Sequence, residues 1–97
     1  MTARTAKKLR AKAYCWTVYI VRCANGSLYT GITNDLPARL AAHNSGAGAK
    51  YTAAFGPVEL AWKRRKRDRS SASKLEAAIK KLPRAEKDGL LAGRRKI

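Results

Sequence analysis

Acidic residues are the scarcest charged class in this sequence. Its 97 residues contain 6 Asp and Glu against 22 Lys and Arg, which gives a formal net charge of +16. Self-repulsion of that size costs stability, so a polyanionic partner is the natural explanation. DNA and RNA are therefore the first candidate partners, and an anionic membrane surface is the second.

Cysteine and histidine are also scarce: the chain has two cysteines, Cys15 and Cys23, and one histidine, His43. The cysteines fall near opposite ends of one expected strand. Eight residues at ~3.3 Å each would hold them roughly 26 Å apart, far beyond the ~7 Å limit for a disulfide. One histidine argues against a zinc cluster. We therefore expect two reduced thiols and a cytoplasmic protein.

Long apolar runs are absent as well. No run approaches the ~20 residues needed to span a bilayer, and no signal-peptide apolar core is present. Residues 1–13 hold five cations and no acid, which is typical of a disordered basic arm. An organellar transit peptide is the alternative, but the segment is short and lacks serine. The chain is short enough for one domain, which we expect over residues 14–93, with a basic tail over residues 94–97.

A β-hairpin is expected near the N-terminus. Residues 16–23 are rich in β-branched and aromatic side chains, residues 24–26 form a turn signal, and residues 27–33 read as the returning strand.

The hydrophobic pattern sets the register of this hairpin. A two-residue loop would mix apolar residues and tyrosines on one face. A three-residue loop with Gly26 in the left-handed conformation separates them. Gly31 then lies directly opposite Tyr19, and Tyr29 is the diagonal neighbour, ~7–8 Å away. Two phenols would flank a position that has no side chain.

The next segments predict a helix and a third strand. Asp35 is placed to cap a helix over residues 36–43. Alternating apolar residues predict a strand over residues 58–62, which runs into a segment rich in cations, residues 63–69.

Two further helices are expected to complete the fold. Ser70, Ser71 and Ser73 offer caps for a helix that extends to Leu82 and carries an apolar stripe. A short helix then covers residues 83–91. The expected fold class is α+β, a three-stranded antiparallel sheet flanked by helices in the order β-β-α-β-α-α.

Taken singly, each polar candidate has a structural explanation. Tyr19 and Tyr29 fit half-buried sheet tyrosines. Arg39 fits a solvated cation, and His43 fits a histidine that interacts with a helix C-terminus. Glu76 fits a capping box with the serine three residues before it, or an ion pair with the lysine four residues after it.

The spacing of these residues forms a joint pattern. It runs Val18-Tyr19, nine residues, Tyr29-Thr30-Gly31, seven residues, Arg39, three residues, His43, then a lone glutamate, Glu76. This pattern resembles the GIY-YIG endonuclease superfamily, in particular its small stand-alone bacterial members, over residues 16–91. Three motif positions differ, because threonine and valine stand for Gly and Ile before the first tyrosine and threonine stands for Ile after the second.

The resemblance implies a role for each of these side chains. Glu76 would hold one Mg²⁺ or another divalent cation, which is satisfied by a carboxylate plus water and phosphate oxygens. Arg39 would bind the scissile phosphate. Tyr19 would act as general base or orient the attacking water, and we expect surrounding positive charge to lower its pKa from ~10. Tyr29 would position water or phosphate, and His43 would carry a proton or bind phosphate.

Other cations are expected to bind the nucleic-acid backbone with low sequence specificity. They are Lys63, Arg64, Arg65, Lys66, Arg67, Lys50 and Lys87. The family often has a late asparagine, but none follows Asn44 here, and Lys87 is the nearest polar substitute.

Three hypotheses follow. The first is a metal-dependent nuclease acting on DNA or RNA, with one metal ion because no spacing of the six acids suggests paired carboxylates. The second is an inactive nucleic-acid-binding domain of the same fold. The third is a basic structural protein at a ribosome or membrane surface. The first two predict that Tyr19, Arg39 and Glu76 converge, and the third that they lie apart. Nothing in the sequence implies a partner protein.

Overall fold

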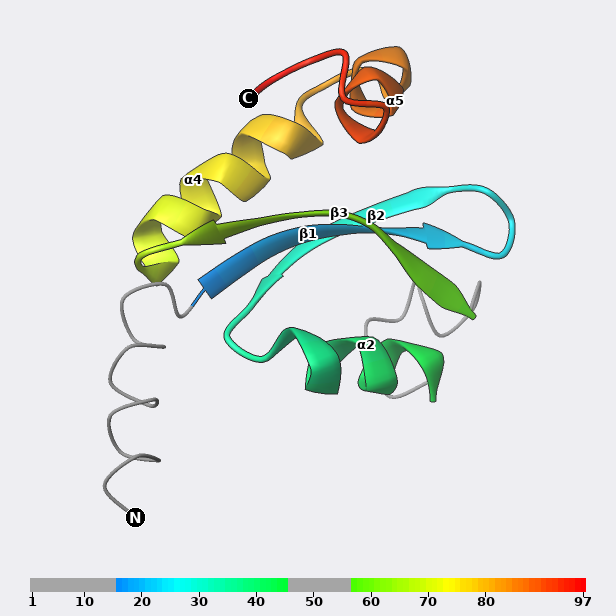
Figure 1. Ribbon diagram of the computed structural model, residues 1–97, viewed down its shortest axis with the longest axis vertical. Coiled ribbons are helices and arrows are strands. Elements are labelled where there is room, and N and C mark those ends of the chain that lie inside the picture. The colour runs from blue at the N-terminus through cyan, green and yellow to red at the C-terminus, as the bar shows by residue number, and fades with distance from the viewer. Residues whose placement is uncertain (1–15, 46–56) are drawn as a thin grey trace.

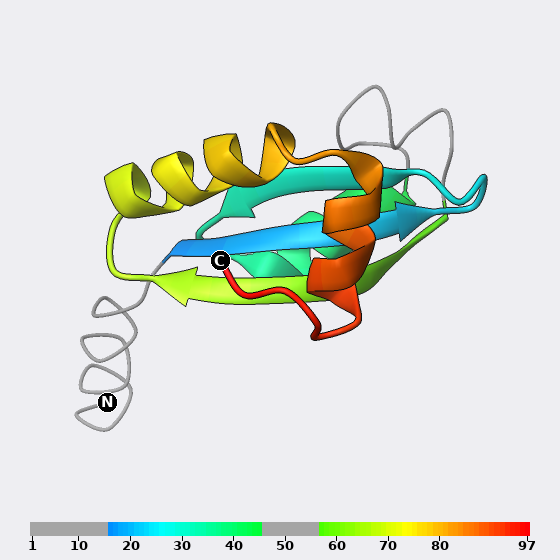
Figure 2. The same cartoon turned by 90° about the horizontal axis from the view of Figure 1, so that it is seen from above.

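A three-stranded antiparallel sheet lies between helices on both of its faces in the computed structural model, which describes residues 16–45 and 57–97 (Figure 1). The elements in chain order are β1 (Trp16–Cys23), β2 (Leu28–Thr33), α2 (Leu36–Asn44), β3 (Val58–Lys66), α4 (Arg69–Lys80) and α5 (Arg84–Leu91). The sheet order is β2-β1-β3. Helix α2 covers one face, and α4 and α5 cover the other (Figure 2). The expected fold class and element order are confirmed.

The register expected for the β1–β2 hairpin is confirmed. Tyr19 pairs with Gly31, and Val21 pairs with Tyr29. The turn closes through two backbone hydrogen bonds between Cys23 and the residues of the turn, and Gly26 has φ +86°, the left-handed conformation that favours glycine.

Strand β3 is longer than expected, because it continues through the cations to Lys66. It pairs with β1 along the whole of that strand. The pairing shifts by one residue, since Ile20 faces Trp62 while the next residue, Val21, faces Leu60. Ala61 is therefore the extra residue of a β-bulge.

The sheet has a hydrophobic core on each face. On the α4 side, Val18 and Ile20 of β1 pack with Ala72 and Ile79 of α4. On the α2 side, Tyr19, Val21, Cys23 and Val58 pack with leucines of α2. We expected half-buried tyrosines on the second face, but Tyr19 is only 1% exposed. Helix α2 covers it, so this tyrosine belongs to a core.

The expected N-terminal cap is confirmed for α2 but not for α4. Asp35 caps α2 as expected, accepting a hydrogen bond from the Ala38 backbone N–H at 3.2 Å. The serine cap expected for α4 is wrong, because the helix begins at Arg69 and Asp68 accepts from the Ser71 N–H at 2.7 Å. This hydrogen bond lowers the pKa of Asp68. The capping box of Glu76 is also wrong, since the serine that it requires lies inside the helix.

The last residues of the chain contact the domain. Ile97 packs against the core on the α4 side, and its carbonyl oxygen accepts a hydrogen bond from Arg64 Nη1 at 3.2 Å. Arg95 forms an ion pair with Glu86 at 2.9 Å. The basic tail expected over residues 94–97 therefore folds back onto the domain in this structure.

Several expectations concern residues outside those described: the basic arm over residues 1–13, Cys15 and Lys50. Cys23 is described, and it is a buried free thiol. Among the described residues, no helix has the length and apolar character that a bilayer crossing requires.

Candidate active site

Tyr19 lies over Gly31, its partner on the neighbouring strand. A Cβ atom added at Gly31 would lie 2.6 Å from the Tyr19 hydroxyl oxygen, closer than any normal contact. Gly31 lies opposite Tyr19, as the expected hairpin register predicts. The phenol itself fills the space over Gly31, so the expectation of open room between two tyrosines is wrong.

His43 joins the two tyrosines from helix α2. Its Nε2 atom is 2.9 Å from the Tyr19 hydroxyl, in a buried hydrogen bond. The imidazole ring lies edge-on to both phenol rings, at centroid distances of 5.9 Å to Tyr19 and 5.4 Å to Tyr29. His43 itself is 1% exposed. Position 43 therefore holds a core histidine inside the candidate site.

Arg39 lies one turn before His43, and side-chain hydrogen bonding, chiefly to Tyr19 and less to Tyr29, raises the pKa of its guanidinium. Because a guanidinium only donates, the Tyr19 oxygen is the acceptor toward Arg39. In the histidine tautomer that carries its proton on Nδ1, the Tyr19 hydroxyl donates to His43 Nε2. The Tyr19 hydroxyl therefore joins Arg39 and His43.

The pKa of Tyr19 is raised above its usual value, chiefly because burial penalises the phenolate, and the neighbouring Arg39 lowers it by less. Positive charge does lower this pKa, as expected, but burial outweighs that effect. The Tyr19 phenol is neutral at neutral pH.

Burial, and then the charge of Arg39, lower the pKa of His43 below its usual value. The folded chain thus resists protonation of His43, whereas the unfolded chain takes up that proton near pH ~6.5. The free energy of unfolding should be intact above that pH and fall as the pH drops through the window down to the folded pKa. We expect His43→Gln to remove this contribution, measured as the difference in urea unfolding between pH 7.5 and pH 5. Equal pH dependence in the variant and the wild type would contradict it.

Glu76 lies on α4, which packs mainly against β2 and β1 from the other face of the sheet. Its carboxylate forms the expected ion pair with Lys80 at 3.3 Å. Its charge is also close enough to contribute, as the smallest cause, to the raised pKa of Tyr19. Tyr19 and Arg39 therefore interact directly, and Glu76 acts on Tyr19, as the weakest electrostatic influence.

The donor chemistry fits a metal held by few protein ligands. No group of three or more His, Cys, Asp and Glu that could hold an ion occurs in residues 16–45 and 57–97. Glu76 is a single carboxylate with its side chain 23% exposed. Mg²⁺ often binds through one or two carboxylates and keeps several waters, so this residue suits it.

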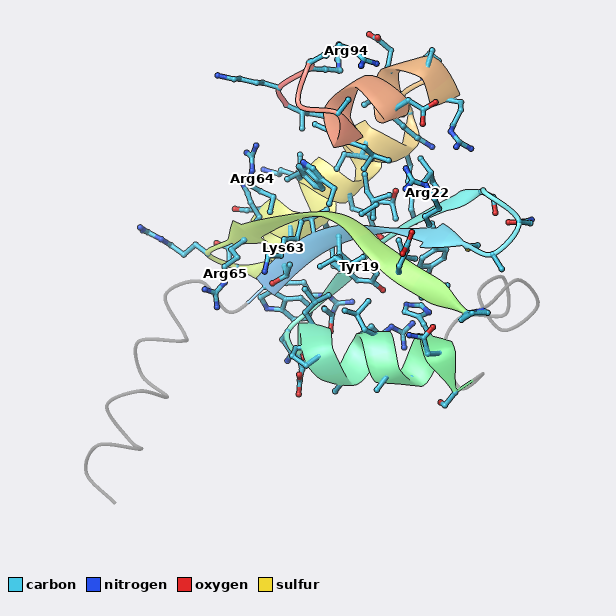
Figure 3. All side chains as sticks on the ribbon, turned by 45° about the vertical axis from the view of Figure 1, so that its right-hand side comes forward. Tyr19, Arg22, Lys63, Arg64, Arg65 and Arg94 are labelled. Atoms are coloured by element: carbon cyan, nitrogen blue, oxygen red, sulfur yellow. The ribbon has the colours of Figure 1, made fainter. Side chains whose placement is uncertain are left out.

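The expected cation patch is divided by the sheet. Lys63 pairs with Tyr19, and Arg65 pairs with Thr17, so both share the tyrosine face. Arg64 and Lys66 therefore lie on the opposite face, as Figure 3 shows for Arg64. Sequence reasoning missed this division, although the period of two along a strand would have revealed it. Lys87 belongs to α5, across the sheet from α2, and Arg67 follows the end of β3.

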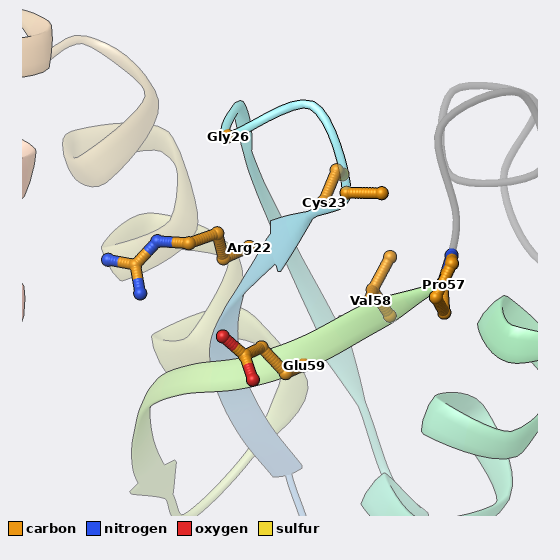
Figure 4. A pocket seen from close by; sticks show the side chains of 7 residues that line it. Arg22, Cys23, Gly26, Pro57, Val58 and Glu59 are labelled. Atoms are coloured by element: carbon orange, nitrogen blue, oxygen red, sulfur yellow. The ribbon is translucent and has the colours of Figure 1, made fainter.

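A separate cavity of about 410 Å³ lies at the hairpin end of the sheet (Figure 4). It is lined by Arg22, Cys23, Ala24, Gly26, Pro57, Val58 and Glu59. None of the candidate catalytic residues lines it, so the tyrosine site is distinct from this cavity.

Known proteins resemble most of this chain. A family model described as the GIY-YIG catalytic domain matches residues 15–88. A UPF0213 protein from Vibrio cholerae is 48% identical over 83 residues, which cover 84% of this chain and 82% of the relative. Another from Desulfotalea psychrophila is 52% identical over 77 residues, 78% of this chain and 70% of the relative.

Two solution NMR structures are also similar. A UPF0213 protein from Bacillus halodurans has a TM-score of 0.53 and 39% identity, over 79% of this chain and 82% of its own. A protein from E. faecalis has a TM-score of 0.55 and 42% identity, with the same coverage of 79% and 82%. The matched region contains both tyrosines, Arg39, His43 and Glu76.

Proposed function

The chain belongs to the GIY-YIG family, among the small bacterial UPF0213 proteins, and we propose that it is a nuclease that hydrolyses nucleic-acid phosphodiesters with one divalent metal ion, Mg²⁺ first among them. The observation that carries this proposal is the buried chain of hydrogen bonds from Arg39 through Tyr19 to His43. In this arrangement Arg39 would bind the phosphate, and Tyr19 and His43 would transfer a proton. The net charge of +16 supports a polyanionic substrate, DNA or RNA.

The proton route uses a neutral phenol. The attacking water gives a proton to the Tyr19 oxygen while the phenol's own proton passes to His43 Nε2, 2.9 Å away. The lowered pKa of His43 keeps its imidazole neutral before the reaction, and with the ring proton on Nδ1 the Nε2 atom serves as the general base. The water oxygen bonds to phosphorus, the phosphorus–O3′ bond breaks, and the 3′ oxygen takes a proton from solvent. The products are a 5′-phosphate and a 3′-hydroxyl, and His43 returns its proton to solvent.

Arg39 controls access to the Tyr19 oxygen in this proposal. Before substrate binds, its guanidinium donates to that oxygen. A phosphate is a stronger acceptor than a neutral phenol, so the arriving substrate draws the guanidinium away. The phenol oxygen is then free to accept a hydrogen bond from water. Lys63 and Arg65, on the same face, add charge along the backbone.

Glu76 is the residue that would hold the metal. When bound, the metal stabilises negative charge on the leaving 3′ oxygen. The partly exposed carboxylate meets the requirement for an accessible ligand.

Arg39→Ala should lower the rate of Mg²⁺-dependent cleavage by about 100- to 1000-fold, the cost of losing one preorganised donor to developing charge. Arg39→Lys should recover only part of it, because lysine lacks the planar fork. The measurement is cleavage of labelled single- and double-stranded DNA. Arg22→Ala is the matched control, since Arg22 is exposed and lies on the other face of the sheet. Equal rates in the Arg39 and Arg22 variants would refute the role.

A non-catalytic nucleic-acid-binding domain is the second candidate function. The 1% exposure of Tyr19 favours it, because a water must reach that oxygen. The lack of asparagine after Asn44 also favours it. Tight, salt-sensitive binding without cutting of any DNA or RNA substrate would establish this candidate instead.

A further inference from the structure

Strand β3 presents cations to both faces of the sheet from an edge position. Among residues 16–45 and 57–97, the sheet order β2-β1-β3 leaves one side of β3 without a partner strand. Lys63 and Arg65 lie on the face of Tyr19, whereas Arg64 and Lys66 lie on the face of α4. Figure 3 shows Lys63 and Arg64 on opposite sides of the β3 ribbon. The edge strand β3 therefore carries positive charge on both faces of the sheet.

On the α4 face, two arginines stack on two tryptophans. The Arg64 guanidinium lies 5.7 Å from the centre of the Trp62 ring, and the Arg69 guanidinium lies 5.6 Å from that of Trp16. Lys66 pairs with Trp16 across the strands, on the same face as both stacks. We call these five residues the tryptophan–arginine surface.

Stacking prepares the two guanidiniums to bind phosphate. A free arginine loses rotamer freedom when it is held in one place, and a cation–π contact offsets part of that cost in advance. Both rings pack against the core on the α4 side, and each has an arginine over it. Bases therefore have little free ring face on which to stack, and the surface suits phosphate rather than base recognition.

Acidic side chains do not neutralise this surface, and the Ile97 carbonyl oxygen that accepts from Arg64 Nη1 at 3.2 Å is a partner that an arriving phosphate would replace. Three acids among the described residues form ion pairs with cations outside this surface: Glu76 with Lys80, Asp88 with Arg84, and Glu86 with Arg95. Asp68, next to Arg69 in the chain, holds the N-terminus of α4. The surface carries the three cations Arg64, Lys66 and Arg69, so it keeps a net positive charge.

We propose that the tryptophan–arginine surface is a second nucleic-acid-binding surface, which holds the phosphates of a further segment of the same polynucleotide on the α4 face of the sheet, opposite Tyr19 and Arg39. The free edge of β3 then lies between two backbone segments. This inference rests on the proposed function, because it takes nucleic acid as the partner. It implies that substrates with two backbone segments, such as a forked duplex, bind more tightly than a short unbranched strand.

The two tryptophans make this surface directly observable. They are the only tryptophans of the chain, and both belong to the surface. We expect forked DNA titrated into the full chain without divalent metal to quench the tryptophan emission. Arg64→Gln with Arg69→Gln should weaken binding of the fork by about 10-fold or more and reduce the slope of log affinity against log salt by about 2, since each lost phosphate contact contributes about 0.9. Arg64→Lys with Arg69→Lys keeps the charge, so it should keep the slope and lose affinity. Thermal unfolding of each variant reports whether the fold is retained.

Two matched pairs separate this inference from the proposed function. Lys63→Gln with Arg65→Gln removes two cations from the active-site face, and Arg22→Gln with Arg84→Gln removes two from the hairpin end. Independent surfaces predict that the losses from the first pair and from Arg64→Gln with Arg69→Gln add in free energy. If the Lys63 and Arg65 pair weakens binding while Arg64→Gln with Arg69→Gln behaves like the hairpin pair, the second surface is refuted and the proposed function stands. If wild-type binding shows no salt dependence, both fail.

Discussion

Glu76→Gln should lower the rate of Mg²⁺-dependent phosphodiester cleavage by at least about 100-fold. A catalytic metal supplies several kcal/mol of charge stabilisation, and each 1.4 kcal/mol corresponds to about a tenfold change in rate. The amide keeps the shape of the side chain but removes the charge that a hard cation requires. The measurement is the cleavage rate of labelled DNA over a range of Mg²⁺ concentrations.

The fold should survive this change. The carboxylate's visible partner is Lys80, at 3.3 Å, and an ion pair of this kind between residues four apart on a helix contributes only about 0.3–0.5 kcal/mol. Glu86→Gln is the matched control, since it removes a carboxylate that is paired with Arg95 on the C-terminal segment. If the two variants cut DNA at the same rate, Glu76 is not the metal ligand.

Gly31→Ala should both destabilise the domain and abolish most cleavage. The added methyl would lie 2.6 Å from the Tyr19 hydroxyl and 2.8 Å from the ring carbon that bears it. The ring is buried and its hydroxyl is bonded to His43, so it has little room to move aside. Overpacking of this kind costs about 1–3 kcal/mol. Displacing the phenol also breaks the chain of hydrogen bonds on which the proton route depends.

Urea unfolding and the cleavage rate measure these two effects. Gly89→Ala is the control: it adds the same methyl to a buried helical position, where the nearest atom would be 3.7 Å away, and alanine is favoured over glycine in a helix. Combining Gly31→Ala with Tyr19→Phe removes the closest atom, so the pair should lose less stability than the sum of the single changes. A Gly31→Ala protein as stable as Gly89→Ala would contradict the steric account.

The order of elements follows from local sequence patterns, and so does the register of the hairpin. Alternation along β1 and a turn with glycine at position 26 allow only one pairing that separates apolar residues from tyrosines. The cap of α2 also follows from local sequence, because Asp35 lies three residues before Ala38, whose backbone N–H donates a hydrogen bond to it. The cap of α4 does not follow from local sequence. Three serines and Asp68 all qualify by residue type, and the end of β3 decides among them by holding Asp68 in extended backbone, at φ −141° and ψ 171°.

The sequence by itself named the candidates for the site, because the spacing of Tyr19, Tyr29, Arg39, His43 and Glu76 resembles the GIY-YIG pattern. It also determined the charge and the position of Gly31. Only the tertiary structure decided the state of those groups. Helix α2 packs over Tyr19, and this burial raises the pKa of a phenol that charge alone would have lowered. The β1–β3 pairing decided which cations face the site. Burial and cross-strand pairing depend on residues far apart in the chain, which is why no local pattern reveals them.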